Sequence, residues 1–238
     1  MTVPVVAIDG PSGAGKGTVS RLLAARLGWH LLDSGALYRL VALGGERAGL
    51  ESEDVAGHAD FAALMQVRFG AGPGGGERVE LGGVDVTDAI RTETAGAGAS
   101  RVARWPAVRM ALLERQRRFA EPPGLVADGR DMGSVIFPQA PLKIFLTASA
   151  AERALRRHKQ LKEKGVAVNL ADLSREIEQR DRQDSTRATA PLRAAADAVH
   201  IDSTARSAAE VVDTVWQLGE ARGLWGTATP TPANGPSG

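Results

Sequence analysis

The sequence predicts an α/β protein in which helices flank a mostly parallel sheet, a small antiparallel β subdomain is inserted, and two arginine-rich helices form a lid. Three observations predict this class. The chain opens with a short apolar run, a glycine-rich turn and then leucines at helical spacing, as a parallel α/β unit does. Between about 65 and 90 the pattern changes to apolar–polar alternation broken by glycines. Two arginine-rich stretches with helical character, 149–164 and 170–183, come later.

The first elements follow from local composition. A buried strand is expected over Val3 to Ile8, because β-branched residues dominate the run and Asp9-Gly10 ends it. The helix after the glycine turn should end at Gly28, a favourable C-terminal stop. A short strand at 29–32 and helices at 37–50 and 52–65 are predicted next.

The middle of the chain predicts an inserted β-meander. Residues 67–69, 78–81 and 84–86 alternate between apolar and polar types around the glycine turn 70–76. A disordered loop is the alternative for this segment. The remaining expected elements are helices at 93–103, 106–120 and 205–222 and strands at 125–127, 142–146 and 198–201.

These elements predict one domain over residues 1–225. Its core comprises 1–64, 91–148 and 188–225, with the inserted subdomain at about 65–90 and the lid at about 149–187. Residues 226–238 are mostly Thr, Pro, Ala, Gly and Ser, which bury too little apolar surface to become ordered, so a disordered tail is expected.

Composition excludes several classes of protein. The formal net charge of +1 gives no overall polyanion-binding surface, so no nucleic-acid partner is expected. The absence of cysteine excludes disulfides and thiolate zinc sites. We find no signal-peptide pattern and no apolar run of the roughly 20 residues needed to span a bilayer. A cytoplasmic protein without a membrane partner is therefore expected.

The glycine-rich turn has the pattern of a phosphate-binding loop. Glycines let the backbone curl so that several N–H groups point inward, and the helix that follows adds positive potential. A lysine in the loop would reach the β- and γ-phosphates, and a hydroxyl follows two positions later, one place after the general motif has it. A plain glycine turn without a ligand is the alternative. The loop residues are Gly10, Pro11, Ser12, Gly13, Ala14, Gly15, Lys16, Gly17 and Thr18.

Two segments are candidates for binding a phosphate acceptor beside this loop. Asp33 and Ser34 come after the second strand, and Arg39 falls in the first turns of the next helix, where it would reach a phosphate. Ser100 stands close to Arg101, Arg104 and Arg109 on adjoining helices, and such groups hold phosphates or base edges. Helix caps and solvated arginines are the alternative for both segments.

A third candidate segment reads Asp128-Gly129-Arg130-Asp131-Met132-Gly133, directly after a buried strand. Asp128 occupies the place where phosphate-loop enzymes carry an acid associated with Mg²⁺. Arg130 suits a phosphate, and Asp131 accepts hydrogen bonds from an exocyclic amine. A turn with a helix cap is the alternative.

The two arginine-rich helices form the fourth candidate. Phosphoryl transfer spreads negative charge over the transferring group, and arginine stabilises that charge with planar, bidentate donors. A lid that carries such residues would also exclude water. An ordinary charged helical hairpin is the alternative. The arginines concerned include Arg153, Arg156, Arg157, Arg180, Arg182 and Arg187.

Together these segments resemble the bacterial cytidylate kinase family of P-loop nucleoside monophosphate kinases. The similar stretches are 8–18, 31–39, 128–138 and 180–192. The resemblance covers the chain to about Arg222 and includes the insertion near 65–90, which in that family is a small β-domain beside the monophosphate site. It implies transfer of phosphate from ATP to CMP and dCMP with Mg²⁺, and a monomer.

The resemblance also implies residue roles. Arg39 and Arg130 match phosphate ligands, whereas Ser100, Arg109 and Asp131 match residues that read cytosine. Lys16, Arg153, Arg156 and Arg180 match catalytic positions that face the transferring group. Thr18 is the implied Mg²⁺ residue, with Asp128 acting directly or through water. The full set implied to hold CMP is Ser34, Arg39, Ser100, Arg109, Arg130, Asp131, Asp184 and Arg187.

Other functions remain open on the residues alone. A kinase for AMP, UMP or shikimate would use the same phosphate loop, and a nucleotide-gated RNA-binding regulator would place its arginines on backbone phosphates. A GTPase is disfavoured because no Asn-Lys-x-Asp motif occurs.

Overall fold

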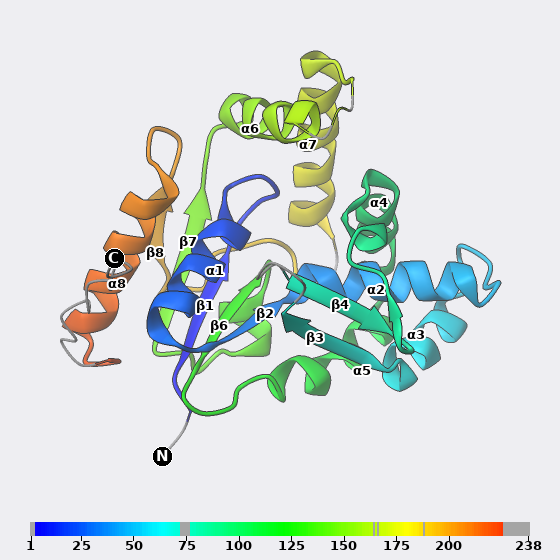
Figure 1. The fold of residues 1–238 in the computed structure, drawn as a ribbon, viewed down its shortest axis with the longest axis horizontal. Helices are drawn as coiled ribbons and strands as arrows, with labels where there is room; N and C mark the ends of the chain where they lie inside the picture. The colour runs from blue at the N-terminus through cyan, green and yellow to red at the C-terminus, as the bar shows by residue number, and fades with distance from the viewer. Residues whose placement is uncertain (1–2, 72–76, 164, 166, 188, 226–238) are drawn as a thin grey trace, which may run out of the picture.

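The computed structural model describes residues 3–71, 77–163, 165, 167–187 and 189–225. Most of the expected glycine turn and the whole expected tail lie outside these residues. The main sheet has five parallel strands in the order β2-β6-β1-β7-β8 (Figure 1). Helices flank this sheet, so the predicted α/β class is confirmed. The strands are β1 (Val5–Asp9), β2 (His30–Asp33), β6 (Leu125–Gly129), β7 (Leu142–Thr147) and β8 (Val199–Asp202).

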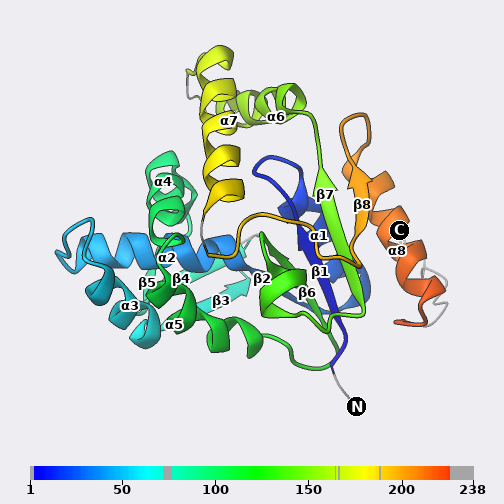
Figure 2. The ribbon, with the colours of Figure 1, turned by 180° about the vertical axis from the view of Figure 1, so that it is seen from behind.

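The apolar residues of β1 divide the core into two parts. Val5 and Ala7 pack with α2, α4 and α5, whereas Val6 and Ile8 pack with α1 and α8. This division follows from the strand period of two, because successive side chains point to opposite faces and both faces are covered. Figure 2 shows the sheet from the side opposite to α1. The helices are α1 (Lys16–Leu27), α2 (Ser34–Arg47), α4 (Glu93–Val102), α5 (Pro106–Arg117) and α8 (Ala208–Ala221).

The helix boundaries follow from local capping chemistry. α2 begins at Ser34, three residues earlier than predicted, because the Asp33 carboxylate accepts a hydrogen bond from the Ala36 amide at 3.0 Å. α5 begins at Pro106, whose missing N–H costs nothing in the first turn. α8 begins with a capping box formed by Ser207 and Glu210.

The inserted segment forms a three-stranded antiparallel sheet, as predicted. Its strands are β3 (Val67–Ala71), β4 (Glu77–Leu81) and β5 (Val84–Asp85), in that spatial order. The sheet shares the main core, because Val79 is buried in it and Phe69 meets Phe119 edge to face at 5.8 Å. The helix α3 (Val55–Leu64) precedes it, and the short 3₁₀ helix η2 (Ala89–Arg91), which was not predicted, leads from it into α4.

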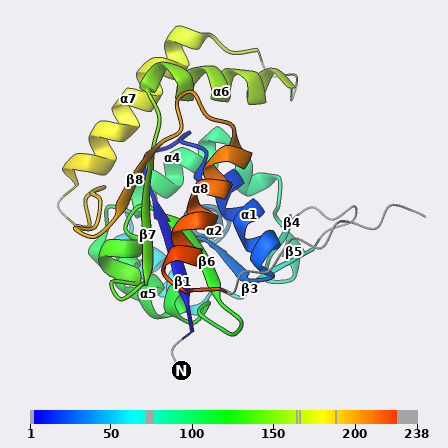
Figure 3. The same cartoon turned by 90° about the vertical axis from the view of Figure 1, so that its left-hand side faces the viewer.

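Two helices project beyond the carboxyl ends of the parallel strands (Figure 3). They are α6 (Ala150–Glu163) and α7 (Leu170–Thr186), and they pack on each other through Leu161, Leu173 and Ile177. The structure therefore places the arginine-rich stretches on the side of the sheet where the phosphate loop lies. Among the described residues, no helix combines the length and apolarity needed to cross a membrane.

Candidate nucleotide site

The glycine-rich loop connects β1 to α1 at the carboxyl edge of the sheet. Gly15 has φ +92° and caps α1 without a side-chain hydrogen bond, so the first amides of the helix face the loop. Gly10 has φ +149°, and a Cβ at this position would lie 2.0 Å from the Leu146 carbonyl oxygen. The loop thus depends on glycine for close backbone approach as well as for conformation.

Lys16 is buried under this loop next to an acid. Its ammonium donates to the Pro11 carbonyl at 3.0 Å and lies 3.9 Å from Asp128 Oδ1. Burial, helped by Arg130, lowers the pKa of Lys16 to about 8. Burial also raises the pKa of Asp128 to about 7, against the effect of Lys16. Lys16 therefore keeps its positive charge at neutral pH. Its ammonium has lost most of its water on burial, and a bound phosphate would provide hydrogen-bond acceptors in place of that water.

Two cavities meet above the carboxyl ends of the strands. The donor cavity has a volume of about 1300 Å³ and lies between the phosphate loop, the lid helices and the start of α8. The acceptor cavity has a volume of about 560 Å³ and lies between α2, α4 and the strand end at Asp128. Lys16, Arg39 and Arg180 line both cavities. The eight residues expected to hold CMP, Ser34, Arg39, Ser100, Arg109, Arg130, Asp131, Asp184 and Arg187, all line the acceptor cavity.

One end of the acceptor cavity is strongly cationic. Arg130 Nε donates to Asp184 Oδ2 at 2.9 Å, and Arg187 Nη1 lies 3.8 Å from the other oxygen of this carboxylate. Burial by itself lowers the pKa of Arg130, but the Asp184 carboxylate raises this pKa by more, so the net shift is upward. Burial and Arg130 lower the pKa of Arg180 to about 10. Arg180 Nε and Arg187 Nη2 are buried donors without a partner among the described residues, which suits an anion.

Arg39 reaches the same end from α2. Its Nη1 donates to the Ile90 carbonyl at 2.7 Å, and this contact orients the guanidinium across the junction between the inserted sheet and α4. Burial lowers the pKa of Arg39, with Arg130 adding to the effect of burial and Asp33 opposing it. An incoming phosphate would therefore meet a cation that is already held in place.

The acceptor cavity also has a buried polar part, next to Arg187. Arg109 and Asp131 are both buried and form an ion pair. The Arg109 guanidinium also lies 5.8 Å from the centre of the Tyr38 ring. Burial raises the pKa of Tyr38 to about 12, so this phenol stays neutral. Such fixed donors and acceptors are able to read the edge of a base.

Arg153 lies differently from the other arginines predicted to face the transferring group. Neither cavity is lined by Arg153 in the described part of the chain, because its guanidinium forms a bidentate pair with Asp181 and donates to the Ser12 and Ala148 carbonyls. These contacts join α6 to α7 and to the phosphate loop. Arg153 therefore ties the two lid helices to the phosphate loop, and its catalytic role stays a prediction.

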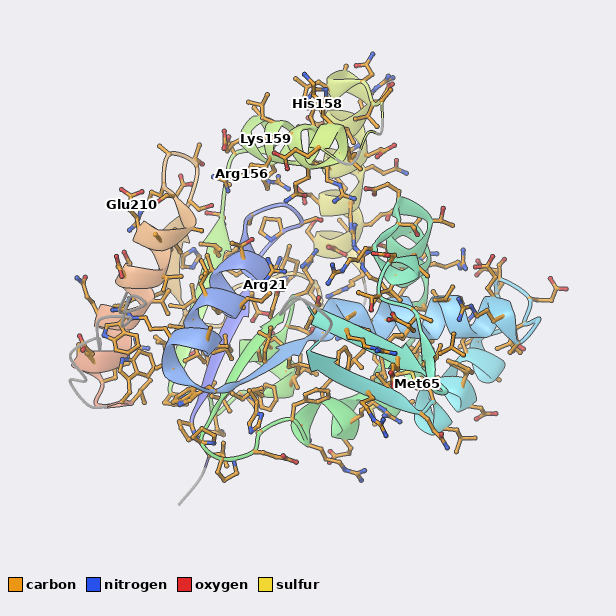
Figure 4. The ribbon with its side chains drawn as sticks, viewed as in Figure 1. Arg21, Met65, Arg156, His158, Lys159 and Glu210 are labelled. Atoms are coloured by element: carbon orange, nitrogen blue, oxygen red, sulfur yellow. The ribbon has the colours of Figure 1, made fainter. Side chains whose placement is uncertain are left out.

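Arg156 lies on the wall of the donor cavity, away from the acceptor cavity. It donates to Ser203 Oγ at 3.1 Å and to the Ser203 carbonyl at 2.6 Å. Figure 4 shows Arg156 on α6 and Arg21 on α1, on opposite sides of the space between the lid and the first helix. Arg180, by contrast, stands at the junction of both cavities.

Sequence similarity to known proteins shows the family of this chain. A model of the cytidylate kinase family matches residues 6–221. The chain belongs to the cytidylate kinase family. A cytidylate kinase from Pseudomonas aeruginosa strain PAO1 is 59% identical over 93% of this chain and 97% of its own. One from Azotobacter vinelandii is 56% identical over 93% and 97%.

Among solved structures, a gluconokinase from Sinorhizobium meliloti 1021 is similar at a TM-score of 0.45 and 17% identity, covering 94% of this chain and 97% of its own. This likeness is too weak to inform function. Membership of the cytidylate kinase family rests on the sequence relatives and on the matching family model.

The loop after β6 is held by Asp9, a residue that the sequence analysis treated only as the end of a strand. Asp9 Oδ1 and Oδ2 accept from the amides of Met132 and Gly133 at 2.7 and 2.8 Å. These amides begin η3 (Met132–Ile136), a π-helical turn that was not predicted. Asp9 therefore connects the donor loop, which follows it in the chain, to the acceptor residues Arg130 and Asp131.

The oxygen groups near Lys16 fit a magnesium ion carried by a nucleotide. The Thr18 hydroxyl is exposed on the donor cavity, and Asp128 Oδ2 packs against Gly17. In the described residues, no cluster of three His, Asp or Glu side chains would hold a metal alone. Mg²⁺ keeps water and phosphate ligands and takes one or two protein oxygens, which Thr18 and Asp128 would supply.

Proposed function

We propose that this member of the cytidylate kinase family transfers the γ-phosphoryl group of ATP to a phosphate oxygen of CMP or dCMP. The observation that carries the proposal is the shared wall of the two cavities. Lys16, Arg39 and Arg180 face both spaces, so a donor and an acceptor phosphate would meet at these cations. The relatives are named cytidylate kinases, which is consistent with the proposed acceptor.

The donor would be held by the phosphate loop. The amides from Gly13 to Thr18 and the Lys16 ammonium would bind the phosphates of ATP, and Arg156 with Ser203 would border its nucleoside. Thr18 and Asp128 would hold Mg²⁺, which supplies charge neutralisation on the phosphate oxygens.

The acceptor would place its phosphate against Arg39, Arg130 and Arg180. A phosphate oxygen of CMP attacks the γ-phosphorus, the bond from this phosphorus to the β-bridging oxygen breaks, and ADP leaves with that electron pair. The attacking oxygen is already anionic near neutral pH, so no general base is required. The cations around it instead offset repulsion between two anions.

Charge stabilisation would fall on Lys16, Arg39 and Arg180, because all three line the junction between donor and acceptor. Arg153 would act indirectly, by positioning Arg180. Its bonds to Asp181 and Ser12 hold α7, which carries Arg180, above the phosphate loop. The lid would also exclude water from the transferring group.

Recognition of the acceptor nucleoside would fall to the part of the acceptor cavity around the Arg109–Asp131 ion pair. Ser100, Arg109 and Asp131 would read cytosine, and Asp184 with Arg187 would contact the sugar or phosphate. Because both cavities lie within one chain, we also infer that a monomer is sufficient for activity.

A coupled assay of ADP release at fixed ATP and Mg²⁺ tests this proposal. CMP and dCMP should stimulate ADP release far more than UMP, AMP or shikimate. Preferential use of AMP, or equal ADP release with no acceptor, would contradict it. Sedimentation of the active protein tests the monomer.

A further inference from the structure

Gln116 is a buried polar residue behind the wall of the acceptor cavity. It lies on α5, has no exposed surface and does not line the cavity itself. Ser34 stands between Gln116 and the cavity and is 3% exposed. The Ser34 hydroxyl donates to Gln116 Oε1 at 2.7 Å. A buried amide in this position is costly unless both its ends are satisfied.

The orientation of the Gln116 amide is fixed by its other end. Gln116 Nε2 donates to the Leu112 carbonyl at 3.3 Å. A backbone carbonyl is only an acceptor, so the nitrogen of the amide must face Leu112 and the oxygen must face Ser34. Gln116 has no exposed surface, which leaves its amide little room to turn over.

This orientation determines the polarity of Ser34. A hydroxyl has one hydrogen to donate and lone pairs to accept with. Since the hydrogen of Ser34 points at Gln116 Oε1, only lone pairs are left for the cavity. Ser34 then presents an acceptor to a bound base, although serine in general serves as either donor or acceptor.

A second acceptor lies at the same end of the cavity. The Asp131 carboxylate is paired with the Arg109 guanidinium, and the oxygens of a carboxylate only accept hydrogen bonds. Asp131 and Arg109 also act on Tyr38, so Ser34, Gln116 and the ion pair form one cluster around that ring. The cluster offers two acceptors to an exocyclic group and a guanidinium to the adjoining ring atoms.

We propose that Gln116 is a positioning residue for base specificity: by holding Ser34 as an acceptor, it makes the cavity favour a 4-amino pyrimidine over a 4-oxo pyrimidine. The inference rests on the proposed kinase function. A 4-amino group donates to both acceptors, whereas a 4-oxo group would bring a third acceptor against them.

The test replaces Gln116 with methionine, which has similar volume but no acceptor oxygen. The Ser34 hydroxyl is then free to donate to a 4-oxo group. The ratio of kcat/KM for CMP to kcat/KM for UMP should fall about tenfold, the equivalent of one neutral hydrogen bond. Gln116→Glu, in the protonated form that burial favours, keeps an oxygen toward Ser34 and an O–H toward the Leu112 carbonyl, and should retain most of the wild-type ratio.

Leu112→Met is the matched control, because it changes packing on the same buried face of α5 without touching Ser34. Its ratio should stay within about twofold of wild type. In the Ser34→Ala background, Gln116→Met should change the ratio no further, since both substitutions remove the same acceptor, the Ser34 hydroxyl held by Gln116. An unchanged ratio in Gln116→Met, or additive effects with Ser34→Ala, would overturn the inference.

A measurement on the wild-type protein covers the case in which the methionine variant does not fold. The ribonucleotide of pyrimidin-2-one lacks any polar group at position 4 but is otherwise like CMP. It should be used about tenfold less well than CMP, and Ser34→Ala should narrow this gap. Equal use of the two nucleotides by the wild type would overturn the inference. Failure of the wild type to use CMP at all would refute the proposed function instead.

Discussion

Arg130→Ala is the substitution that most directly separates the two cavities. Arg130 lines the acceptor cavity, and its Nε donates to Asp184 at 2.9 Å. Its guanidinium is 21% exposed, so solvent screens its charge only in part. Removing it deletes a phosphate contact and leaves the Asp184 carboxylate, 11% exposed, with less compensation close to the place of the acceptor phosphate.

The size of the effect follows from these contacts. A hydrogen bond to a charged group is worth about 1.5–3 kcal/mol, and the uncompensated carboxylate adds repulsion of similar order. The sum, about 3–6 kcal/mol, corresponds to a loss of about 10²- to 10⁴-fold in kcat/KM for CMP. Arg130 also lowers the pKa of Lys16, so its removal leaves Lys16 more firmly charged and should change ATP affinity by less than about threefold.

Steady-state kinetics with varied CMP, together with ATP binding measured in the absence of CMP, distinguish the two sites. Arg130→Lys is the control. It keeps the positive charge but loses the planar guanidinium with its bidentate donors, and should retain only part of the wild-type activity. The double variant Arg130→Ala/Asp184→Asn should regain about tenfold over Arg130→Ala, because the repelling charge is gone. Equal losses for CMP and ATP, or no recovery in the double variant, would refute the reasoning.

Further substitutions test the rest of the site. Lys16→Met should lower kcat by at least about 10²-fold, and near-normal turnover would remove Lys16 from the junction. Arg153→Gln should weaken ATP binding and the pairing of the lid with the phosphate loop, seen as faster proteolysis of 150–186; unchanged proteolysis would contradict its positioning role. Gly10→Ala should cost more than about 3 kcal/mol of stability in thermal melts, because its Cβ would meet the Leu146 carbonyl, whereas Gly28→Ala, with open space around it, should cost about 1–2 kcal/mol. Burial raises the pKa of Asp9 from 3.8 to about 6, so the stability that this group contributes is complete below about pH 4 and is lost as the pH rises through about 6. Urea unfolding should show this loss in the wild type and a flatter profile in Asp9→Asn, and equal slopes would contradict it.

The sequence was sufficient to predict the elements whose cause is local. The phosphate loop could be read from its glycines, because a backbone that approaches itself or a ligand closely has no room for a Cβ. The strand β1 and the helices that cover it were predictable from apolar periodicity. The chemical types in the acceptor segments predicted an anion site, since several arginines near strand ends seldom belong to a core.

Tertiary structure decided which side chains line the two cavities. Arg153 and Arg180 look alike in the sequence, yet the packing of α6 on α7 pairs Arg153 with Asp181 and leaves Arg180 at the junction of the cavities. The roles of Asp9 and Gln116 could not be predicted from the sequence, because their hydrogen-bond partners Met132 and Ser34 are 123 and 82 residues away. Composition and periodicity report forces that act within a few residues, whereas the direction of a hydrogen bond between distant segments is set only when the core brings them together.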